Sequence, residues 1–341
     1  MRLSIVIPLY NSEKFIKPCV ESLIAQNLDP ASHEIIIIDD GSKDGSYEQV
    51  VELEKMHPSV KGYRKENGGA GDARNFGMDK ASGKYLYFLD VDDYLANGTL
   101  SLILNTIEQN NLDLLCFDSI KTTDGNLKNP TYKESATSLD IMDGISYIAK
   151  KDFDFEVWRY IIDLEFLRST NIRFKTDSIL EDSYFTVHLF IEAQRMARVA
   201  IDAHRYVQQP DSITYKPGRE HAQRMLDDLI KLAEHYEGLI QKYNGIDHHQ
   251  KAAFLKQLQA KKEFFVYYYT VRAYNGNFDF SEVWKTLQRM KVIDAYPFRA
   301  ITHREDKFAE RLQYIFNRKL TLFGLFTTVR PLQNLKKKLR S

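Results

Sequence analysis

The sequence predicts an α/β protein with a mainly parallel, Rossmann-like sheet flanked by helices and with a helical carboxyl-terminal extension. Apolar runs rich in Ile, Val, Leu and Tyr alternate with helical patterns over the amino-terminal part, as in βαβ units. Beyond Pro210 and Pro217 the pattern changes to long helices. A length of 341 residues also exceeds what one hydrophobic core usually organises. We therefore predict an α/β domain over 1–215 and a helical region over 216–341.

The predicted strands are apolar runs bounded by turn residues. They lie at 2–10, 33–40, 60–66, 84–90, 112–120 and 198–209. The unbroken Ile run at 35–38 is typical of a strand that is buried on both faces of a sheet. A polar stretch at 121–138 interrupts the alternation, and it is predicted to be a loop or a hairpin turn.

The predicted helices follow from apolar residues at helical spacing. They lie at 12–26, 44–56, 70–81, 96–109, 140–151, 163–169, 181–194, 219–243, 248–274 and 279–291. Ser12 is the expected N-cap of the first helix, and Pro18 is expected to kink that helix.

The composition excludes two classes of protein. Hydrophobic residues make up 43% of the chain and aromatic residues 12%, which excludes a disordered chain. The 47 basic and 47 acidic residues cancel, which argues against a protein that binds nucleic acid. The segment 318–341 nevertheless contains seven Lys or Arg and no Asp or Glu, beside several apolar residues. This local pattern fits an anionic membrane surface, and it also fits a solvated tail.

The two cysteines, Cys19 and Cys116, are predicted to be buried, reduced thiols because they lie far apart inside apolar stretches. Reduced thiols indicate a cytoplasmic protein. The chain shows no signal-peptide pattern and no apolar run near the roughly 18 residues that a membrane-spanning helix needs. We expect a soluble protein or one bound peripherally to the inner face of the cell membrane.

Carboxylates follow two of the predicted strands. Asp39 and Asp40 end the strand at 33–40, and Asp90, Asp92 and Asp93 lie at the end of the strand at 84–90. Ligands of open α/β sheets bind beyond the carboxyl ends of the strands. Because clustered acids raise one another's pKa, a bound Mg²⁺ or Mn²⁺ is the simplest reason for the cluster. The alternative is that Asp40 and Asp93 cap neighbouring helices or turns.

A glycine-rich segment, NGGAGDARNFG (67–77), lies between these strands and opens a predicted helix. Glycines such as Gly69 let the backbone approach a ligand closely, and a helix start near Arg74 favours phosphate. The segment matches neither GxGxxG nor the P-loop spacing, so a flexible turn is the alternative. Together with the two acidic strand ends, it predicts a site for a nucleotide diphosphate held by a metal.

Four segments in order along the chain resemble the inverting glycosyltransferases of family 2, which have the GT-A fold. They are SIVIPLYN (4–11), EIIIIDDGSKDGS (34–46), NGGAGDARNFGMDKASGKYLYFLDVDD (67–93) and LED (180–182). The resemblance covers about the first 215 residues and implies that 1–215 is a nucleotide-sugar-binding catalytic domain. It implies transfer of a hexose or N-acetylhexosamine from a nucleotide diphosphate sugar, a UDP-sugar, to a hydroxyl of a saccharide or lipid-linked saccharide.

The same resemblance implies roles for individual residues. Asp182 is implied as the base that takes the acceptor proton, Asp92 with Asp90 as the Mn²⁺ or Mg²⁺ site, and Trp158 and Glu181 as acceptor-side residues. The residues implied to bind the donor nucleotide are Pro8, Tyr10, Asp39, Asp40, Gly69, Arg74, Asn75 and Asp90. Because a helix start favours a negative charge, Asp182 is expected to stay ionised.

Other features narrow this interpretation or leave it open. No Gln-x-x-Arg-Trp motif of processive synthases occurs, which favours transfer of single sugars. Arg159 stands where the family leads us to expect lysine, and Gln208 where relatives often carry arginine. The alternatives are an inactive nucleotide-sugar-binding module and an aspartyl phosphatase that uses LDVDD (89–93). The sequence assigns no role to His204 and leaves the oligomeric state open.

Overall fold

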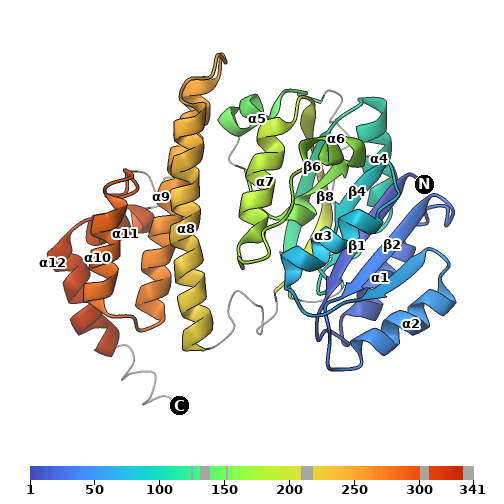
Figure 1. The fold of residues 1–341 in the computed structure, drawn as a ribbon, viewed down its shortest axis with the longest axis horizontal. Helices are drawn as coiled ribbons and strands as arrows, with labels where there is room; N and C mark the ends of the chain where they lie inside the picture. Colours follow the sequence, from blue (N-terminus) through green and yellow to red (C-terminus); the bar gives the residue numbers. More distant parts are fainter. Residues whose placement is uncertain (124–125, 131–138, 151–152, 209–217, 300–306, 333–341) are drawn as a thin grey trace. The chain divides into compact units, whose positions relative to one another are not determined.

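A computed structural model describes residues 1–123, 126–130, 139–150, 153–208, 218–299 and 307–332 (Figure 1). The chain divides into two compact units, Met1–Tyr215 and Lys216–Ser341. The residues around this boundary, 209–217, lie outside the described ones, and so does the part of the basic tail at 333–341.

The first unit is built on an eight-stranded sheet with the strand order β3-β2-β1-β4-β7-β6-β8-β5. The strands are β1 (Leu3–Leu9), β2 (His33–Asp39), β3 (Val60–Arg64), β4 (Tyr85–Phe88), β5 (Tyr94–Leu95), β6 (Leu114–Thr122), β7 (Tyr160–Asp163) and β8 (Met196–Val207). The first four strands of the order are parallel, and β7 runs antiparallel between β4 and β6. The predicted α/β class with a mainly parallel sheet is confirmed.

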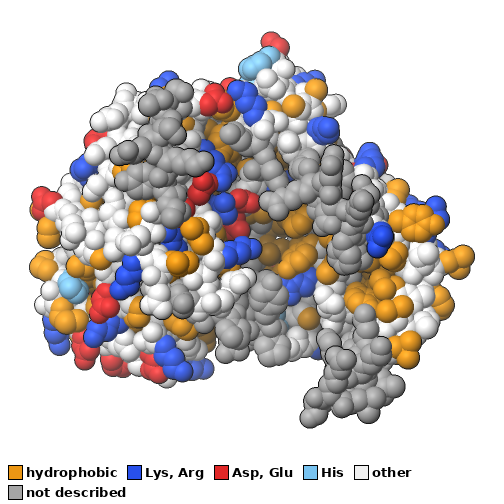
Figure 2. Space-filling view, turned by 180° about the vertical axis from the view of Figure 1, so that it is seen from behind, with side chains coloured by type: hydrophobic (Ala, Val, Ile, Leu, Met, Phe, Trp, Pro, Cys, Tyr) orange, Lys and Arg blue, Asp and Glu red, His pale blue; other side chains and the backbone are white. Residues whose placement is uncertain are grey.

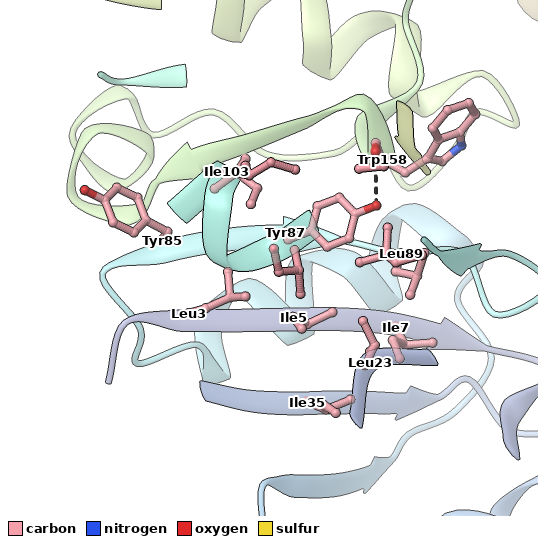
Figure 3. Packing of buried hydrophobic residues seen from close by; sticks show 14 of the residues in the cluster. Leu3, Ile5, Ile7, Leu23, Ile35, Tyr85, Tyr87, Leu89, Ile103 and Trp158 are labelled. Carbon is pink, nitrogen blue, oxygen red and sulfur yellow. Dashed lines mark hydrogen bonds between the residues drawn. The ribbon is translucent and has the colours of Figure 1, made fainter. Parts of the chain in front are cut away.

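Helices cover both faces of this sheet (Figure 1). They are α1 (Ile16–Ile24), α2 (Ser46–Met56), α3 (Ala70–Lys80), α4 (Thr99–Gln109), α5 (Gly144–Lys150), α6 (Leu164–Thr170) and α7 (Glu181–Glu192), with a short 3₁₀ turn η1 (Val157–Arg159). Alternate β1 residues, among them Ile5, pack with Leu23 of α1 and Ile103 of α4 (Figure 3). Val6 faces α3, where a Cβ on Gly77 would lie 2.4 Å from the Val6 Cγ1 atom. Glycine at position 77 therefore lets α3 pack closely on β1.

The start of α1 differs from the prediction. The N-cap is Phe15, and the carbonyl of Ser12 accepts bonds from the amides of Phe15 and Ile16 in the preceding turn. Pro18 consequently lies in the first turn of α1, where a backbone N–H has no intrahelical partner to lose. The expected kink at Pro18 therefore has no cause.

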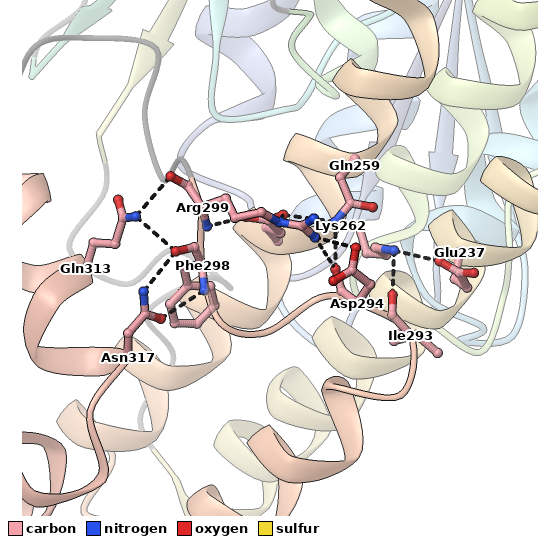
Figure 4. Close-up of polar contacts among 10 residues, drawn as sticks. Glu237, Gln259, Lys262, Ile293, Asp294, Phe298, Arg299, Gln313 and Asn317 are labelled. Atoms are coloured by element: carbon pink, nitrogen blue, oxygen red, sulfur yellow. Dashed lines mark hydrogen bonds and ion pairs between the residues drawn. The ribbon is translucent and has the colours of Figure 1, made fainter. Parts of the chain in front are cut away.

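The second unit consists of helices. They are α8 (Arg219–Tyr243), α9 (Lys251–Asn275), α10 (Phe280–Met290), α11 (Lys307–Phe316), α12 (Lys319–Gly324) and the π-helical turn η3 (Leu325–Val329). A polar network, which we call the Lys262 network, joins α8 and α9 to the segment after α10 (Figure 4). In it the Lys262 ammonium donates to Glu237 Oε2 at 2.6 Å, and Arg299 Nε donates to Glu263 Oε1 at 2.9 Å.

The structure bears on the expectations about the cysteines and about membrane-spanning helices. Cys19 and Cys116 are free and buried, as predicted. Among the described helices, none combines the length and the apolar character needed to cross a membrane.

Candidate functional site

The acidic ends of β2 and β4 meet at one edge of the sheet, because β1 lies between these strands and is parallel to both. Asp39, at the end of β2, is fully buried. Its Oδ2 atom lies 3.1 Å from Arg64 Nε, and its Oδ1 atom accepts a 3.3 Å bond from the Ser42 amide. Asp90 follows β4 at the same edge. The carboxylates predicted to share one edge of the sheet therefore do so.

Asp40 holds the glycine-rich turn in place. Its carboxylate accepts bonds from the amides of Gly68 and Gly69, at 2.9 and 2.8 Å, and from the Lys65 ammonium at 2.7 Å. Gly69 has φ of 89°, which only glycine adopts without strain. Because these amides bind Asp40, they are not free for a phosphate, which corrects the prediction made from the glycines. Asp40 is accordingly a capping residue of this turn, the alternative that the sequence left open.

Arg74 of α3 joins the two acidic motifs of the chain. Its Nη2 atom donates to Asp90 Oδ1 at 2.7 Å, and its Nη1 atom donates to Glu181 Oε1 at 2.6 Å and to Asp182 Oδ1 at 3.1 Å. The Arg74 side chain is only 5% exposed, whereas those of Asp90 and Asp182 are 29% and 24% exposed. We call these four residues the Arg74 cluster. It places one buried cation among three carboxylates, two of which reach solvent.

Asp182 lies in the first turn of α7, with Glu181 beside it. Burial raises the pKa of Asp182, Arg74 lowers it, and the negative charges of Glu181 and Asp90 raise it again. The net pKa lies well above the usual range for Asp. Loss of water and two neighbouring acids therefore outweigh the favourable helix dipole, on which the expectation of an ionised Asp182 rested.

Asp92 lacks a cationic partner within the described part of the chain. Burial, followed by the charges of Asp93 and Asp90, raises its pKa to about 7. Asp90 contacts Arg74 through one oxygen only. No group of three or more His, Cys, Asp or Glu among the described residues is arranged to hold a metal ion. Two carboxylates nevertheless fit Mg²⁺ or Mn²⁺, which commonly take further ligands from substrate phosphates and water.

Asp93 is a buried structural residue of the same acidic turn. Its amide donates to the Asp90 carbonyl at 3.1 Å, and its Oδ1 atom accepts from the Val207 amide at 2.8 Å. Its Oδ2 atom lies 2.8 Å from Nε2 of His204, the residue to which the sequence assigned no role. No local sequence signal links these residues, because Asp93 and His204 are 111 positions apart.

Trp158 and Asn75, which were expected to contact the acceptor and the donor nucleotide, contact other residues of the protein instead. Trp158 is 5% exposed, and its ring stacks with those of His204 and Tyr206 in the core. This burial corrects the interpretation of Trp158 as an open acceptor platform.

The side-chain amide of Asn75 donates to the Phe174 carbonyl and accepts from the Phe174 backbone amide, both at 2.9 Å. Asn75 therefore anchors the backbone at Phe174, and both its polar atoms are engaged.

Pro8 and Tyr10 lie at the carboxyl end of β1, between the ends of β2 and β4. Pro8 is partly exposed, and Tyr10 is 45% exposed immediately after the strand. An exposed aromatic ring beside buried Asp39 is compatible with stacking on a planar ligand.

Comparisons with known proteins show which family the chain resembles. The family model described as Glycosyl transferase family 2 matches residues 4–180. The uncharacterized glycosyltransferase EpsJ of Bacillus subtilis is 32% identical over 69% of this chain and 70% of EpsJ. The poly(ribitol-phosphate) beta-glucosyltransferase of Bacillus spizizenii is 27% identical over 99% of this chain. The chain spans about half of that relative, since the match covers 51% of it.

Solved structures of similar fold include two with bound sugar nucleotides. TarS of S. aureus, residues 1-349, in complex with UDP-GlcNAc has a TM-score of 0.60 and 19% identity, covering 87% of this chain and 89% of that 1-349 chain. The mannosyltransferase PcManGT from Pyrobaculum calidifontis, in complex with GDP-Man and Mn²⁺, has a TM-score of 0.55 and 15% identity, covering 95% of this chain and 85% of PcManGT. At these identities the two structures support the fold alone.

Proposed function

Because the chain belongs to glycosyl transferase family 2, we propose that it transfers one hexose or N-acetylhexosamine from a UDP-sugar to a hydroxyl of a saccharide or lipid-linked saccharide, with inversion. The GT-A fold expected from the resemblance is confirmed by the similar structures. The observation that carries the proposal is the Arg74 cluster. It brings the acid after β4 and the acids of α7 to one guanidinium, although Arg74 and Asp182 are 108 positions apart.

In the proposed reaction, Asp182 accepts the proton of the acceptor hydroxyl while that oxygen attacks the anomeric carbon and the bond to the diphosphate breaks. A carboxylate with a raised pKa is a stronger base near neutral pH than an ordinary aspartate. Arg74 orients Asp182 through Nη1 and prevents the three acids from repelling one another. When bound at Asp92 and Asp90, Mg²⁺ or Mn²⁺ supplies positive charge to the departing diphosphate.

We propose that the nucleoside of the donor lies against Asp39, Pro8 and Tyr10. Asp39 Oδ2 is buried, is ion-paired with Arg64 Nε at 3.1 Å and accepts no hydrogen bond of good geometry, so it keeps the capacity to accept from the imide N–H of uracil. The curated relative TarS, 27% identical over 60% of this chain, is named a poly(ribitol-phosphate) beta-N-acetylglucosaminyltransferase, which makes UDP-N-acetylglucosamine a donor to test. The names of TarS and the B. spizizenii relative also make poly(ribitol phosphate) an acceptor to test beside oligosaccharides.

Sugar transfer is tested directly with the full chain. UDP-glucose, UDP-N-acetylglucosamine and GDP-mannose are each incubated with Mn²⁺ or EDTA and with saccharide or poly(ribitol phosphate) acceptors. We expect Mn²⁺-dependent release of UDP together with a glycoside product. Donor binding without UDP release would support an inactive binding module, and phosphate release from simple phosphomonoesters would support the aspartyl phosphatase. Absence of binding and of release with all three donors would contradict the proposal.

We also propose that the second unit contacts anionic membrane through its last described helices. Leu322 and Phe326 are buried, whereas Leu320 and Phe323 are 83% and 48% exposed, and exposed Lys319 lies beside them. Figure 2 shows hydrophobic side chains on the surface of this unit. Apolar side chains next to basic ones fit a lipid surface of negative charge. Such contact would place the protein at the inner face of the cell membrane.

Vesicle sedimentation tests this contact. The full chain should sediment with vesicles containing phosphatidylglycerol and much less with phosphatidylcholine alone, and 0.5 M salt should weaken the binding. The double substitution Leu320→Asp and Phe323→Asp should abolish sedimentation. Equal sedimentation of the wild type and the double variant would contradict the proposal.

A further inference from the structure

His204 is fully buried in β8 and has a neighbour at each ring nitrogen. Its Nε2 atom lies 2.8 Å from Asp93 Oδ2, and its Nδ1 atom lies 3.0 Å from the Tyr87 hydroxyl. The Trp158 ring stacks on the imidazole with centroids 4.0 Å apart and planes 8° apart. The imidazole is thus held at both nitrogens and on one face.

The hydrogen bonds of these residues form one connected series. The Tyr87 hydroxyl lies 3.2 Å from the Trp158 carbonyl and donates to it, because a carbonyl only accepts (Figure 3). The same hydroxyl lies 3.0 Å from His204 Nδ1, and the Nε2 atom on the other side of the ring faces Asp93 Oδ2.

All three members of this series, Asp93, His204 and Tyr87, are buried, and each has a polar partner in the series. A buried polar network whose groups are satisfied is rigid and specifies one arrangement.

One end of this series lies at the turn that carries Asp92, and the other end lies near Asp182. At one end Asp93 closes the turn that carries Asp92, through its amide bond to the Asp90 carbonyl. At the other end the bond to Trp158 holds the turn η1. The neighbouring amide in η1, that of Val157, bonds to the Asp182 carboxylate and lowers its pKa. One series of contacts therefore connects the Asp92 turn to the environment of Asp182.

We propose that Asp93, His204 and Tyr87 are positioning residues that hold the Asp92 turn and Asp182 at a fixed separation. The inference rests on the proposed function, which assigns the metal site to Asp92 at one end of the series and the catalytic base to Asp182 at the other end. A misplacement of about 1 Å in such a site costs roughly 100-fold in rate. Loss of the series should consequently reduce turnover and leave donor affinity intact, since Asp39 and Tyr10 contact neither end through a bond of this series.

Tyr87→Phe removes one hydroxyl from the series and keeps the ring. We expect kcat to fall roughly 10- to 100-fold, with the donor KM changed less than twofold. Tyr85→Phe is the matched control, because Tyr85 is buried on the same strand but bonds to neither His204 nor Trp158 (Figure 3). A kcat of Tyr87→Phe equal to that of Tyr85→Phe would overturn the inference.

Asp93→Ala removes the other end of the series. It should lose activity as Tyr87→Phe does, because the Asp92 turn is then no longer tied to His204 and Val207. A wild-type kcat in Asp93→Ala would overturn the inference. A wild type that transfers no sugar contradicts the proposed function instead, which separates the two failures.

Discussion

Each unit of the chain contains a cluster of charged residues around a buried cation, and the two clusters differ in how their charges are paired. In the Lys262 network, Lys262 binds Glu237, and Arg299 binds both Glu263 and Asp294. Each carboxylate there touches a cation, and the contacts tie three segments together. In the Arg74 cluster a single cation is shared by three acids, and Asp92 nearby has no cationic partner among the described residues.

This difference supports the proposal that the Arg74 cluster is the one that serves ligands. Buried acids without enough cations are costly unless a cation or a proton arrives. A paired network gives only structure, whereas an excess of carboxylates leaves groups ready to bind a metal and to accept a proton. The following predictions test this contrast, beginning with the largest expected effect.

Asp182→Asn should reduce sugar transfer by roughly 100- to 10,000-fold, since an amide cannot accept the acceptor proton. Binding of the UDP-sugar, measured by calorimetry, should be retained. Glu192→Gln at the exposed last position of the same helix is the control and should leave the rate unchanged. Full transfer activity in Asp182→Asn would remove Asp182 from its assigned role.

Arg74→Met should impair both stability and activity. Removing the cation leaves buried acids unbalanced, which should lower the free energy of unfolding by about 3–5 kcal/mol. Transfer should also fall in the folded fraction, because Asp182 loses the donor at 3.1 Å that orients it. Chemical denaturation and the rate per folded molecule measure the two effects separately. Loss of stability with an unchanged rate would show that the Arg74 cluster, like the Lys262 network, serves the stability of the fold only, which would contradict the contrast.

Lys262→Met should affect stability alone. Glu237 loses its 2.6 Å partner but is 19% exposed, so water replaces part of the contact and the loss should be about 1–3 kcal/mol. The rate per folded molecule should equal that of wild type. A lower rate in this variant would show that the second unit contributes to turnover, contrary to the contrast drawn here.

Asp92→Asn should change how stability depends on pH in the metal-free protein. The pKa of Asp92 is raised in the folded state from 3.8 to about 7, so the folded state binds the proton more tightly than the unfolded state. Wild type should therefore lose stability relative to Asp92→Asn as the pH rises from about 4 to about 7, with no further change above. Denaturation of both proteins at several pH values measures this difference. A difference that is constant across this range would contradict the raised pKa.

The parts of the site that depend on local sequence could be predicted, and the parts that depend on distant contacts could not. Acidic runs after apolar strands revealed the sheet edge that carries Asp39 and Asp90. The partners of Arg74 lie as far as 108 positions away, so only the fold shows that it binds acids and not a phosphate. From the sequence, Asp40 could either bind a ligand or cap a turn. The bonds that it accepts from Gly68 and Gly69 favour the capping role.

The secondary structure was also predictable only where the local sequence carries a clear pattern. Long apolar strands such as β1 and β2 were visible, because burial on both faces produces unbroken runs. The strands β5 and β7 have two and four residues and were missed, since such lengths carry no readable alternation. His204 was missed as a site residue because a single histidine within a strand has no local signal of its partners.

The most direct test of the central claim is the anomeric configuration of the product, measured by NMR on the glycoside formed from an α-linked UDP-sugar. Direct displacement with Asp182 as base predicts a β-linked product from the wild type and almost none from Asp182→Asn. An α-linked product, or a β-linked product formed at the same rate by Asp182→Asn, would contradict the account.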